Sequence, residues 1–243
     1  YVSICSPNSL HDAHVRLALR VGAHAICEKP LVINPWNLDQ LEEIESESAG
    51  RIYTVLQLRL HPRVRELKAE LSASPGSKYS VDLAYVTRRG SWYHHSWKGD
   101  EQRSGGLAMN IGIHFFDLLL WLFGRVERSL VHVSTPGRMA GALELERARV
   151  RWFLSVDAAD LPESIRRKAG HSFRCLTIDG EEIDLSAKFS DLHTEVYREI
   201  LAGYGCGIAE ARPSIELVYN VRNSRETHTN GSAHPLLAGA ARL

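Results

Sequence analysis

The stretch GGLAMNIGIHFFD, residues 105–117, runs directly into the apolar segment LLLWLF, residues 118–123. Asn110, His114 and Asp117 are spaced at i, i+4 and i+7, which places their side chains on one face of a helix. The sequence therefore predicts an apolar helix with one polar stripe, a name kept below for Asn110, His114 and Asp117.

The start of this helix is a candidate anion site. Ser104 precedes two glycines and is predicted to cap the helix. Free backbone N–H groups at a helix start favour an anion, and glycine lets a ligand approach the backbone closely. The same stretch also fits a buried helix whose His and Asn side chains are hydrogen-bonded in the core. The rest of the chain has to separate these two interpretations.

The composition is that of a globular protein. With 243 residues, 44% hydrophobic and 24% charged, the chain can bury the core of one large domain or two modest ones. The 29 basic and 29 acidic residues cancel, so no overall field attracts nucleic acid or an anionic membrane. Four distant cysteines without a CxxC pair favour reduced thiols in a cytoplasmic protein and argue against a metal site. No apolar run reaches about 18 residues, and we expect no membrane span.

The first 60 residues alternate between strand and helix patterns. Strands are predicted at 1–5, 24–27 and 52–58, with helices at 10–21 and 35–48 between them. Such alternation is typical of a parallel, doubly wound sheet. Ligands of these sheets bind at the carboxyl ends of the strands, which are here the polar segments 6–8, 28–30 and 57–59.

The segment 72–77 (SASPGS) is linker-like, and we place a domain boundary at residue 75, which divides 1–75 from 76–243. Beyond it, the patterns predict mostly consecutive strands, with a type I′ turn signal at Asp179-Gly180. The predicted fold class is therefore α/β followed by α+β. The second part is an open antiparallel sheet, covered on one face by the helix of the polar stripe and by helices near 191–202 and 214–225.

Lys29 and His114 are the candidate catalytic residues. Lys29 follows a strand, where desolvation could lower its pKa enough for proton transfer; the alternative is an ordinary surface lysine. The unperturbed pKa of histidine lies near neutrality, so His114 could act as general acid or base. A lysine and a histidine that meet over a cleft suit removal of a proton from an alcohol while a hydride leaves the same carbon.

The segment 88–100 mixes cations with aromatic side chains. In a basic protein this mixture would indicate stacking on nucleic acid, whereas zero net charge favours a pocket wall for one anionic small molecule. Arg88, Lys98 and Arg103 are candidates for binding its phosphate or carboxylate oxygens, with a solvated sheet edge as the alternative. The His94-His95 pair matches no metal-ligand spacing, and a solvated loop is expected there.

Three groups of residues make the sequence resemble the Gfo/Idh/MocA oxidoreductase family in order and spacing. They are Ser6-Pro7-Asn8 with His11, then Glu28-Lys29-Pro30, and then Gly105-Gly106 through Asn110, Gly112, His114 and Asp117. Each group is weak alone, but the series is specific and covers most of the chain. Residues 88–117 are particularly similar to the branch whose members oxidise UDP-N-acetyl-2-amino-2-deoxyglucuronate.

The resemblance implies a partial Rossmann domain that carries NAD, and a second domain that shapes the substrate site and joins a homo-oligomer, either a tetramer or a dimer. It implies NAD-dependent oxidation of a ring hydroxyl, at C3, of a UDP-linked N-acetylamino sugar uronic acid in lipopolysaccharide biosynthesis. Lys29 and His114 would be catalytic. The residues expected at the cofactor are Ser6, Pro7, Asn8, His11, Glu28, Lys29 and Gln57. The residues expected at the substrate are Lys29, Arg88, Lys98, Arg103, Ser104, Asn110 and His114.

Two departures from the family pattern matter. Asn110 stands where many relatives have Asp; its side chain can hydrogen-bond a sugar hydroxyl but cannot act as a base. The family's opening strand and Gly-rich pyrophosphate loop are absent from these 243 residues, so we expect a piece of a longer enzyme that is inactive alone. The alternatives are a family dehydrogenase of a free sugar or inositol, and a non-catalytic sugar-nucleotide-binding subunit.

Overall fold

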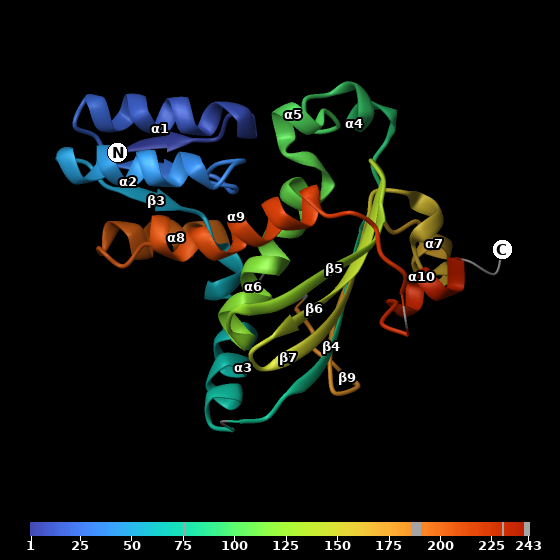
Figure 1. Cartoon of the computed structure of the whole chain (residues 1–243). Coiled ribbons are helices and arrows are strands. Elements are labelled where there is room, and N and C mark those ends of the chain that lie inside the picture. The colour runs from blue at the N-terminus through green and yellow to red at the C-terminus, as the bar shows by residue number, and fades with distance from the viewer. Residues whose placement is uncertain (75, 186–190, 230, 241–243) are drawn as a thin grey trace.

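The computed structural model describes residues 1–74, 76–185, 191–229 and 231–240. Its N-terminal part holds a parallel sheet in the order β1-β2-β3 (Figure 1). The strands are β1 (Val2–Ile4), β2 (Ala25–Cys27) and β3 (Ile52–Thr54). The expected parallel sheet of a doubly wound fold is thus confirmed, with its strands alternating along the chain with helices.

Helices cover both faces of this sheet. One face is covered by α1 (His11–Arg20) and α2 (Trp36–Glu47), and the other by α8 (Leu192–Leu201). The short helices η1 (Asn8–Leu10) and η2 (Gln57–Leu60) follow β1 and β3, and α3 (Pro62–Ser72) packs against η2 and the helix of the polar stripe. Cys27 faces the core shared with α1 and α2, whereas Ile26 points the other way and packs against Val196 of α8. The expectation that the 191–202 helix covers the second sheet is therefore wrong. Its apolar side chains instead complete the far face of the parallel sheet.

The second sheet has the order β5-β6-β7-β4-β8-β9. Its strands are β4 (Tyr79–Thr87), β5 (Val126–Ser134), β6 (Arg138–Leu145), β7 (Ala148–Ser155), β8 (Ser172–Ile178) and β9 (Glu181–Glu182). Neighbouring strands are antiparallel except β4 and β7, which run parallel because the β5-β6-β7 meander returns alongside β4. Asp179 and Gly180 have φ of 49° and 88°, as the predicted type I′ turn between β8 and β9 requires.

The helix of the polar stripe lies against this sheet. It consists of a π-helical turn, η3 (Ala108–Gly112), that continues into α6 (Ile113–Phe123). A Cβ on Gly112 would lie 2.6 Å from Leu154 Cδ1, so glycine lets the helix approach β7 closely. Phe116 meets the buried Trp152 of β7 edge to face, with 5.3 Å between ring centroids.

The start of this helix differs from the expectation. Ser104 does not cap it but ends the short helix α5 (Glu101–Ser104), which Asp100 caps by accepting from the backbone N–H groups of Gln102 and Arg103. Gly105 then turns the chain with φ of 83°. The N–H groups of Gly105 and Gly106 already donate to Glu101 O and Ser104 Oγ, so they are not available to an anion. The pattern Ser-Gly-Gly was misleading because the cap lies one turn earlier.

The long helix α9 (Ile208–Asn223) runs between the two sheets and touches α6 and β5 on one side and α2 and β3 on the other (Figure 1). It begins six residues before the expected Ser214, because Glu210 Oε2 accepts from the N–H of Gly207 and so caps the start. Pro213 lies inside the helix rather than ahead of it.

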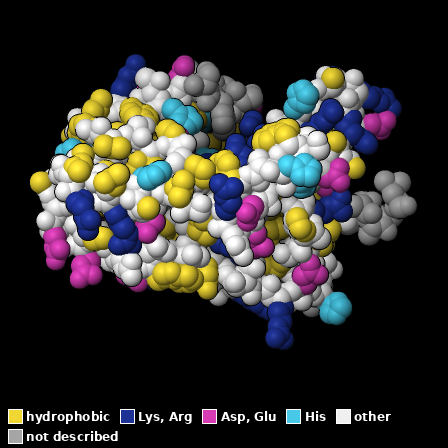
Figure 2. All heavy atoms as spheres, turned by 90° about the horizontal axis from the view of Figure 1, so that it is seen from above, with side chains coloured by type: hydrophobic (Ala, Val, Ile, Leu, Met, Phe, Trp, Pro, Cys, Tyr) yellow, Lys and Arg dark blue, Asp and Glu magenta, His cyan; other side chains and the backbone are white. Residues whose placement is uncertain are grey.

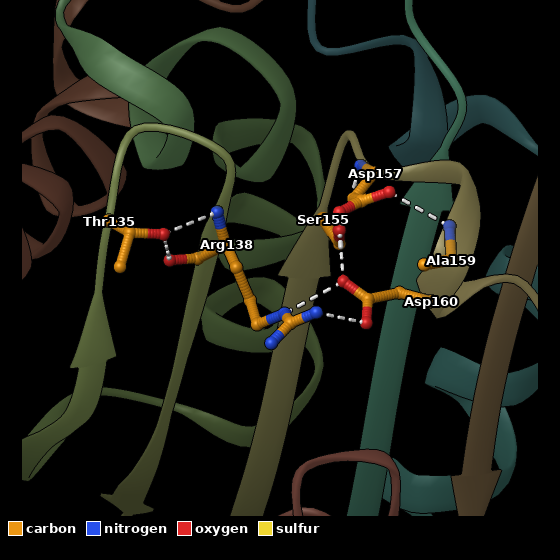
Figure 3. A network of polar contacts seen from close by, with 6 residues as sticks. All are labelled: Thr135, Arg138, Ser155, Asp157, Ala159 and Asp160. Atoms are coloured by element: carbon orange, nitrogen blue, oxygen red, sulfur yellow. Dashed lines mark hydrogen bonds and ion pairs between the residues drawn. The ribbon is translucent and has the colours of Figure 1, made fainter. Parts of the chain in front are cut away.

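A polar network fixes the end of the second sheet (Figure 3). Arg138 of β6 donates twice to Asp160, at 2.8 and 2.5 Å, and Ser155 Oγ donates to the same carboxylate at 2.6 Å. These bonds hold the turn that follows β7 against β6. The remaining elements are α4 (Ser91–His95), η4 (Ala158–Asp160), α7 (Glu163–Arg167) and α10 (Pro235–Ala240).

Glu101–Phe123 is the one helical stretch, within the described ranges, that is long and apolar enough to cross a membrane. Of its most apolar window, 72% is buried inside the fold. This is the burial of a core helix that packs against a sheet. Across the same ranges, no group of three or more His, Cys, Asp or Glu side chains is placed to hold a metal ion.

Candidate active site

The polar stripe faces the N-terminal part of the chain. Lys29 Nζ donates to the backbone carbonyl of Asn110 at 2.8 Å. Arg59 makes a two-pronged ion pair with Asp117, at 2.9 and 2.6 Å. Lys29 and Arg59 both follow strands of the parallel sheet, so strand ends meet the stripe along the seam between the two sheets. The helix therefore brings the stripe to the seam beside Lys29, while the ion pair of Asp117 also matches the alternative of a helix whose polar side chains are hydrogen-bonded in the core.

Lys29 is partly buried, and its environment changes its proton affinity. Burial lowers the pKa of Lys29 from 10.5 to about 8; Glu28 raises it, and the positive charges of Lys98 and Arg89 lower it further. A lysine with this pKa can exchange a proton near neutral pH. Lys29 thus differs from an ordinary surface lysine in its partial burial and in its bond to the Asn110 carbonyl.

His114 lies on the same seam. Burial lowers the pKa of His114 well below its usual 6.5, and Lys29, His193 and Arg174 add to the effect through their positive charge. The imidazole is therefore neutral at ordinary pH and can accept a hydrogen bond or a proton. The charge of Lys29 thus acts on the imidazole of His114, the other predicted catalytic residue.

Asn110 is positioned by a residue that sequence reasoning missed. Its Nδ2 donates to the hydroxyl of Tyr93 at 3.0 Å. Tyr93 is buried, and this burial raises its pKa above 10. Tyr93 therefore stays protonated, and its hydroxyl orients the Asn110 amide by accepting this hydrogen bond.

The predicted cofactor residues gather at the strand ends. His11 is fully buried, with ring nitrogens 2.7 Å from the carbonyl oxygen of Pro30 and 2.9 Å from that of Ser6. It thus ties together the loops after β1 and β2. Asn8 is buried as well and donates to the carbonyl of Ser104 at 2.7 Å. Both side chains hold the loops in place rather than point outward, and Pro7 directly precedes Asn8.

The remaining cofactor candidates are better placed to bind a ligand. Ser6 Oγ lies 2.9 Å from His14 Nδ1, and Glu28 Oε1 lies 3.2 Å from His193 Nε2. Gln57 is buried, and its Oε1 has no hydrogen-bond partner among the residues described. Since a buried acceptor without a partner is costly, Gln57 fits a ligand that donates a hydrogen bond at this edge, as the carboxamide of a nicotinamide does.

The predicted substrate residues divide into two groups. Lys98 is partly buried, and its ammonium lies 5.8 Å from the ring centroid of Trp92, close enough to the site to influence Lys29. Arg88 and Arg103 are exposed. The Ser104 hydroxyl is wholly buried and donates to Asp100 O, so its expected contact with substrate is not supported.

Two further residues at the seam were missed. Arg89, not its neighbour Arg88, lies near enough to lower the pKa of Lys29. The strand alternation of β4 ends at Thr87, so no periodic pattern indicates which of the two arginines turns inward. His193 lies on α8, far away along the chain, and only the packing of α8 on the parallel sheet brings it to Glu28.

Comparison with known proteins agrees with this geometry. Residues 1–56 match the NAD-binding Rossmann fold of an oxidoreductase family, and residues 76–156 match the C-terminal alpha/beta domain of the same family. The structure of the WlbA (WbpB) dehydrogenase from Thermus thermophilus, solved with NAD and UDP-GlcNAcA, is 51% identical, with a TM-score of 0.93. The match covers 97% of this chain and 76% of that one.

Other relatives have a lower sequence identity or match a smaller part of the chain. The WlbA dehydrogenase from Bordetella pertussis is 19% identical with a TM-score of 0.74, over 91% of this chain and 76% of that chain, which shows the fold alone. The D-glucoside 3-dehydrogenase of Escherichia coli is 30% identical over 51% of this chain. The match covers 35% of that enzyme, so this chain spans about a third of such curated relatives. On the two domain matches and the Thermus likeness, the chain belongs to the Gfo/Idh/MocA oxidoreductase family.

Proposed function

We propose that the enzyme carrying this chain oxidises the C3 hydroxyl of a UDP-linked N-acetylamino sugar uronic acid with NAD. The observation that carries the proposal is the meeting of Lys29 with the polar stripe on the seam between the two sheets. The similarity to a dehydrogenase solved with NAD and UDP-GlcNAcA supports the choice of substrate.

We assign Lys29 the role of general base. With a pKa of about 8, part of the Lys29 population is a neutral amine near physiological pH. Only the neutral amine can accept the proton of the hydroxyl. NAD, when bound, supplies the acceptor for the hydride that leaves the same carbon. The carbonyl of Asn110 holds Lys29 Nζ in place.

His114 and Asn110 orient the substrate. Because the pKa of His114 is far below neutrality, its imidazole stays uncharged and positions the reacting hydroxyl through a hydrogen bond. The Asn110 amide, fixed by Tyr93, can bind a neighbouring sugar oxygen. Ser6, Glu28 and Gln57 would hold the cofactor at the carboxyl ends of the strands.

We further propose a cytoplasmic homo-oligomer that serves lipopolysaccharide biosynthesis, with residues 1–75 as the cofactor domain and residues 76–243 as the substrate domain. The four free cysteines support a reducing compartment. One face of the second sheet is covered by α6 and α9. Leu161, Ile165 of α7 and Leu236 of α10 pack against part of the other face, and we assign the rest of that face to subunit contact.

A substrate panel tests the proposal on the full-length protein encoded by the native gene. We expect kcat/KM for UDP-GlcNAcA to exceed that for a free sugar or inositol by at least about 100-fold, because a charged sugar nucleotide gains several charge-assisted contacts. Equal values would favour the polyol dehydrogenase. Binding of UDP-GlcNAcA without reduction of NAD would favour the non-catalytic subunit.

A further inference from the structure

A hollow of about 180 Å³ lies beside the seam, between the α4–α5 region, the turn after β5 and the end of α9. Its lining includes Tyr93, Lys98, Glu101, Leu107, Thr135 and Arg222. Ligand pockets for whole small molecules are usually about 300–1,000 Å³, so this hollow suits one group of a larger ligand. Through Tyr93 and its bond with Asn110, the hollow adjoins the residues proposed to bind the sugar.

Arg222 is the unusual residue of this hollow. Its side chain is 14% exposed, and its bond to the carbonyl of Ile33 is long, at 3.5 Å. Its nearest carboxylate is that of Glu101, 4.0 Å from Nε, and in the part of the chain described this Nε lacks a hydrogen-bond partner. A guanidinium buried to this degree normally has well-formed bonds to an acid.

Other arginines of the chain show the normal case. Burial lowers the pKa of Arg59, but the two-pronged bond to Asp117 and the attraction of that charge, with smaller contributions from Cys206 and Glu210, together outweigh burial and raise it. The pKa of Arg222 is lowered instead, because burial outweighs the weak attraction of Glu101. The charge of Arg222 is therefore incompletely compensated within the protein.

Lys98 supplies a second positive charge to the hollow. Its ammonium is held between two indoles, with 5.8 Å to the ring centroid of Trp92 and 5.6 Å to that of Trp97. Figure 2 shows basic and acidic side chains intermixed on the face seen from above. Recognition of an anion therefore depends on local cations such as Lys98 and Arg222 rather than on a field over the surface.

We propose that this hollow is an oxyanion subsite, in which Arg222 and Lys98 bind a phosphate or carboxylate group of the substrate. The proposal rests on the proposed function, which provides a ligand with both groups. A bound oxyanion compensates the charge of Arg222 through bonds that Glu101 is too distant to make. Glu101 then acts as an internal competitor whose charge weakens anion binding.

The test is calorimetric titration of the full-length protein, saturated with NAD, with UDP, UDP-GlcNAc and UDP-GlcNAcA. These ligands separate the two sources of the anion, since only UDP-GlcNAcA carries a carboxylate. The variants are Arg222→Gln, which removes the charge, and Arg222→Lys, which keeps it. Arg225→Gln is the matched control, because Arg225 is an exposed cation just beyond the end of α9.

We expect Arg222→Gln to raise Kd by about 10- to 150-fold, the usual effect of one charge-assisted contact. A rise for all three ligands identifies the diphosphate as the anion, and a rise for UDP-GlcNAcA alone identifies the carboxylate. Arg222→Lys should bind with intermediate affinity, and Arg225→Gln like the wild type. Unchanged Kd values for every ligand in Arg222→Gln would overturn the proposal.

Two further readouts separate binding from folding and from the proposed function. Glu101→Gln should lower Kd, an effect of opposite sign that a loss of structure cannot produce. Arg222→Gln should unfold at the same or a higher temperature; a lower temperature with loss of NAD binding would show a structural role and refute the subsite. If the wild type binds NAD but none of the three ligands, the proposed function fails. In that case pyrophosphate serves as the probe. Pyrophosphate binding by the wild type that is lost in Arg222→Gln would support the subsite, and no binding of pyrophosphate to the wild type would overturn it.

Discussion

Burial lowers the pKa of both Lys29 and His114, but the usual pKa of a lysine is 10.5 and that of a histidine is 6.5. Lys29 changes its charge at about pH 8, whereas His114 is neutral at any pH above its usual 6.5. This difference makes the choice of base measurable. A base is active only when it is unprotonated, so the residue that titrates in the working range governs the pH dependence.

We predict that kcat/KM of the full-length enzyme rises about tenfold per pH unit below pH 8 and becomes constant above it. Lys29→Ala should lower kcat by about 10² or more and abolish this rise, and His114→Ala should lower kcat similarly but retain it. Initial rates between pH 6 and 10 provide the measurement. A profile that is flat from pH 7 to 9 in the wild type would rule out Lys29 as the base.

The lowered pKa also means that charged Lys29 lowers the free energy of unfolding. Its folded pKa of about 8 lies below its usual 10.5, so the penalty is fully present below pH 8 and disappears above 10.5. The shift corresponds to about 3 kcal/mol, and loss of the Asn110 hydrogen bond offsets about 1, leaving about 2 kcal/mol. We predict that Lys29→Met raises Tm at pH 7 by several degrees and by much less at pH 10.5. Equal gains at both pH values, by scanning calorimetry, would contradict this account.

At the scale of elements, the sequence predicted what depends on local periodicity. The polar stripe, the short strands and the Asp179-Gly180 turn follow from spacing and turn chemistry, and each is present. The position of α8 could not be predicted, because an amphipathic helix fits any apolar face and only the three-dimensional arrangement selects one. Which of Arg88 and Arg89 points toward the site could not be predicted either, since both follow the end of β4, where the strand alternation ceases.

The ion pair between Arg59 and Asp117 joins the end of η2 to α6. The side chains of both residues are largely buried, at 14% and 3% exposure. We predict that Asp117→Asn destabilises the protein by about 3 kcal/mol, because it leaves a buried guanidinium without its counter-charge. The double variant Arg59→Met with Asp117→Leu should recover most of this loss, since it removes both charges. Urea unfolding of the wild type and the two variants is the measurement, and an Asp117→Asn protein as stable as the wild type would show that the pair is dispensable.

At the scale of the whole molecule, one continuous core spans both sheets. Side chains of β2, α2 and α3 belong to the same buried cluster as those of α6, β7 and α9. The sequence showed two patterns of strands and a linker between them, which favoured two independent parts. The position of α9 between the sheets could not be deduced from it, because the helix is far from both in the sequence.

We predict that this continuous core makes the two parts unfold together. The bonds of Asn8, Lys29 and Arg59 to the 104–117 region cross the seam, and α9 contacts elements of both sheets, so neither part keeps its core when the other unfolds. Scanning calorimetry should show one transition whose calorimetric and van't Hoff enthalpies agree. Asp117→Asn should move this single transition to lower temperature without splitting it, because α9 still bridges the sheets. Two resolved transitions in the wild type would contradict the prediction and would instead support an independent domain boundary near residue 75.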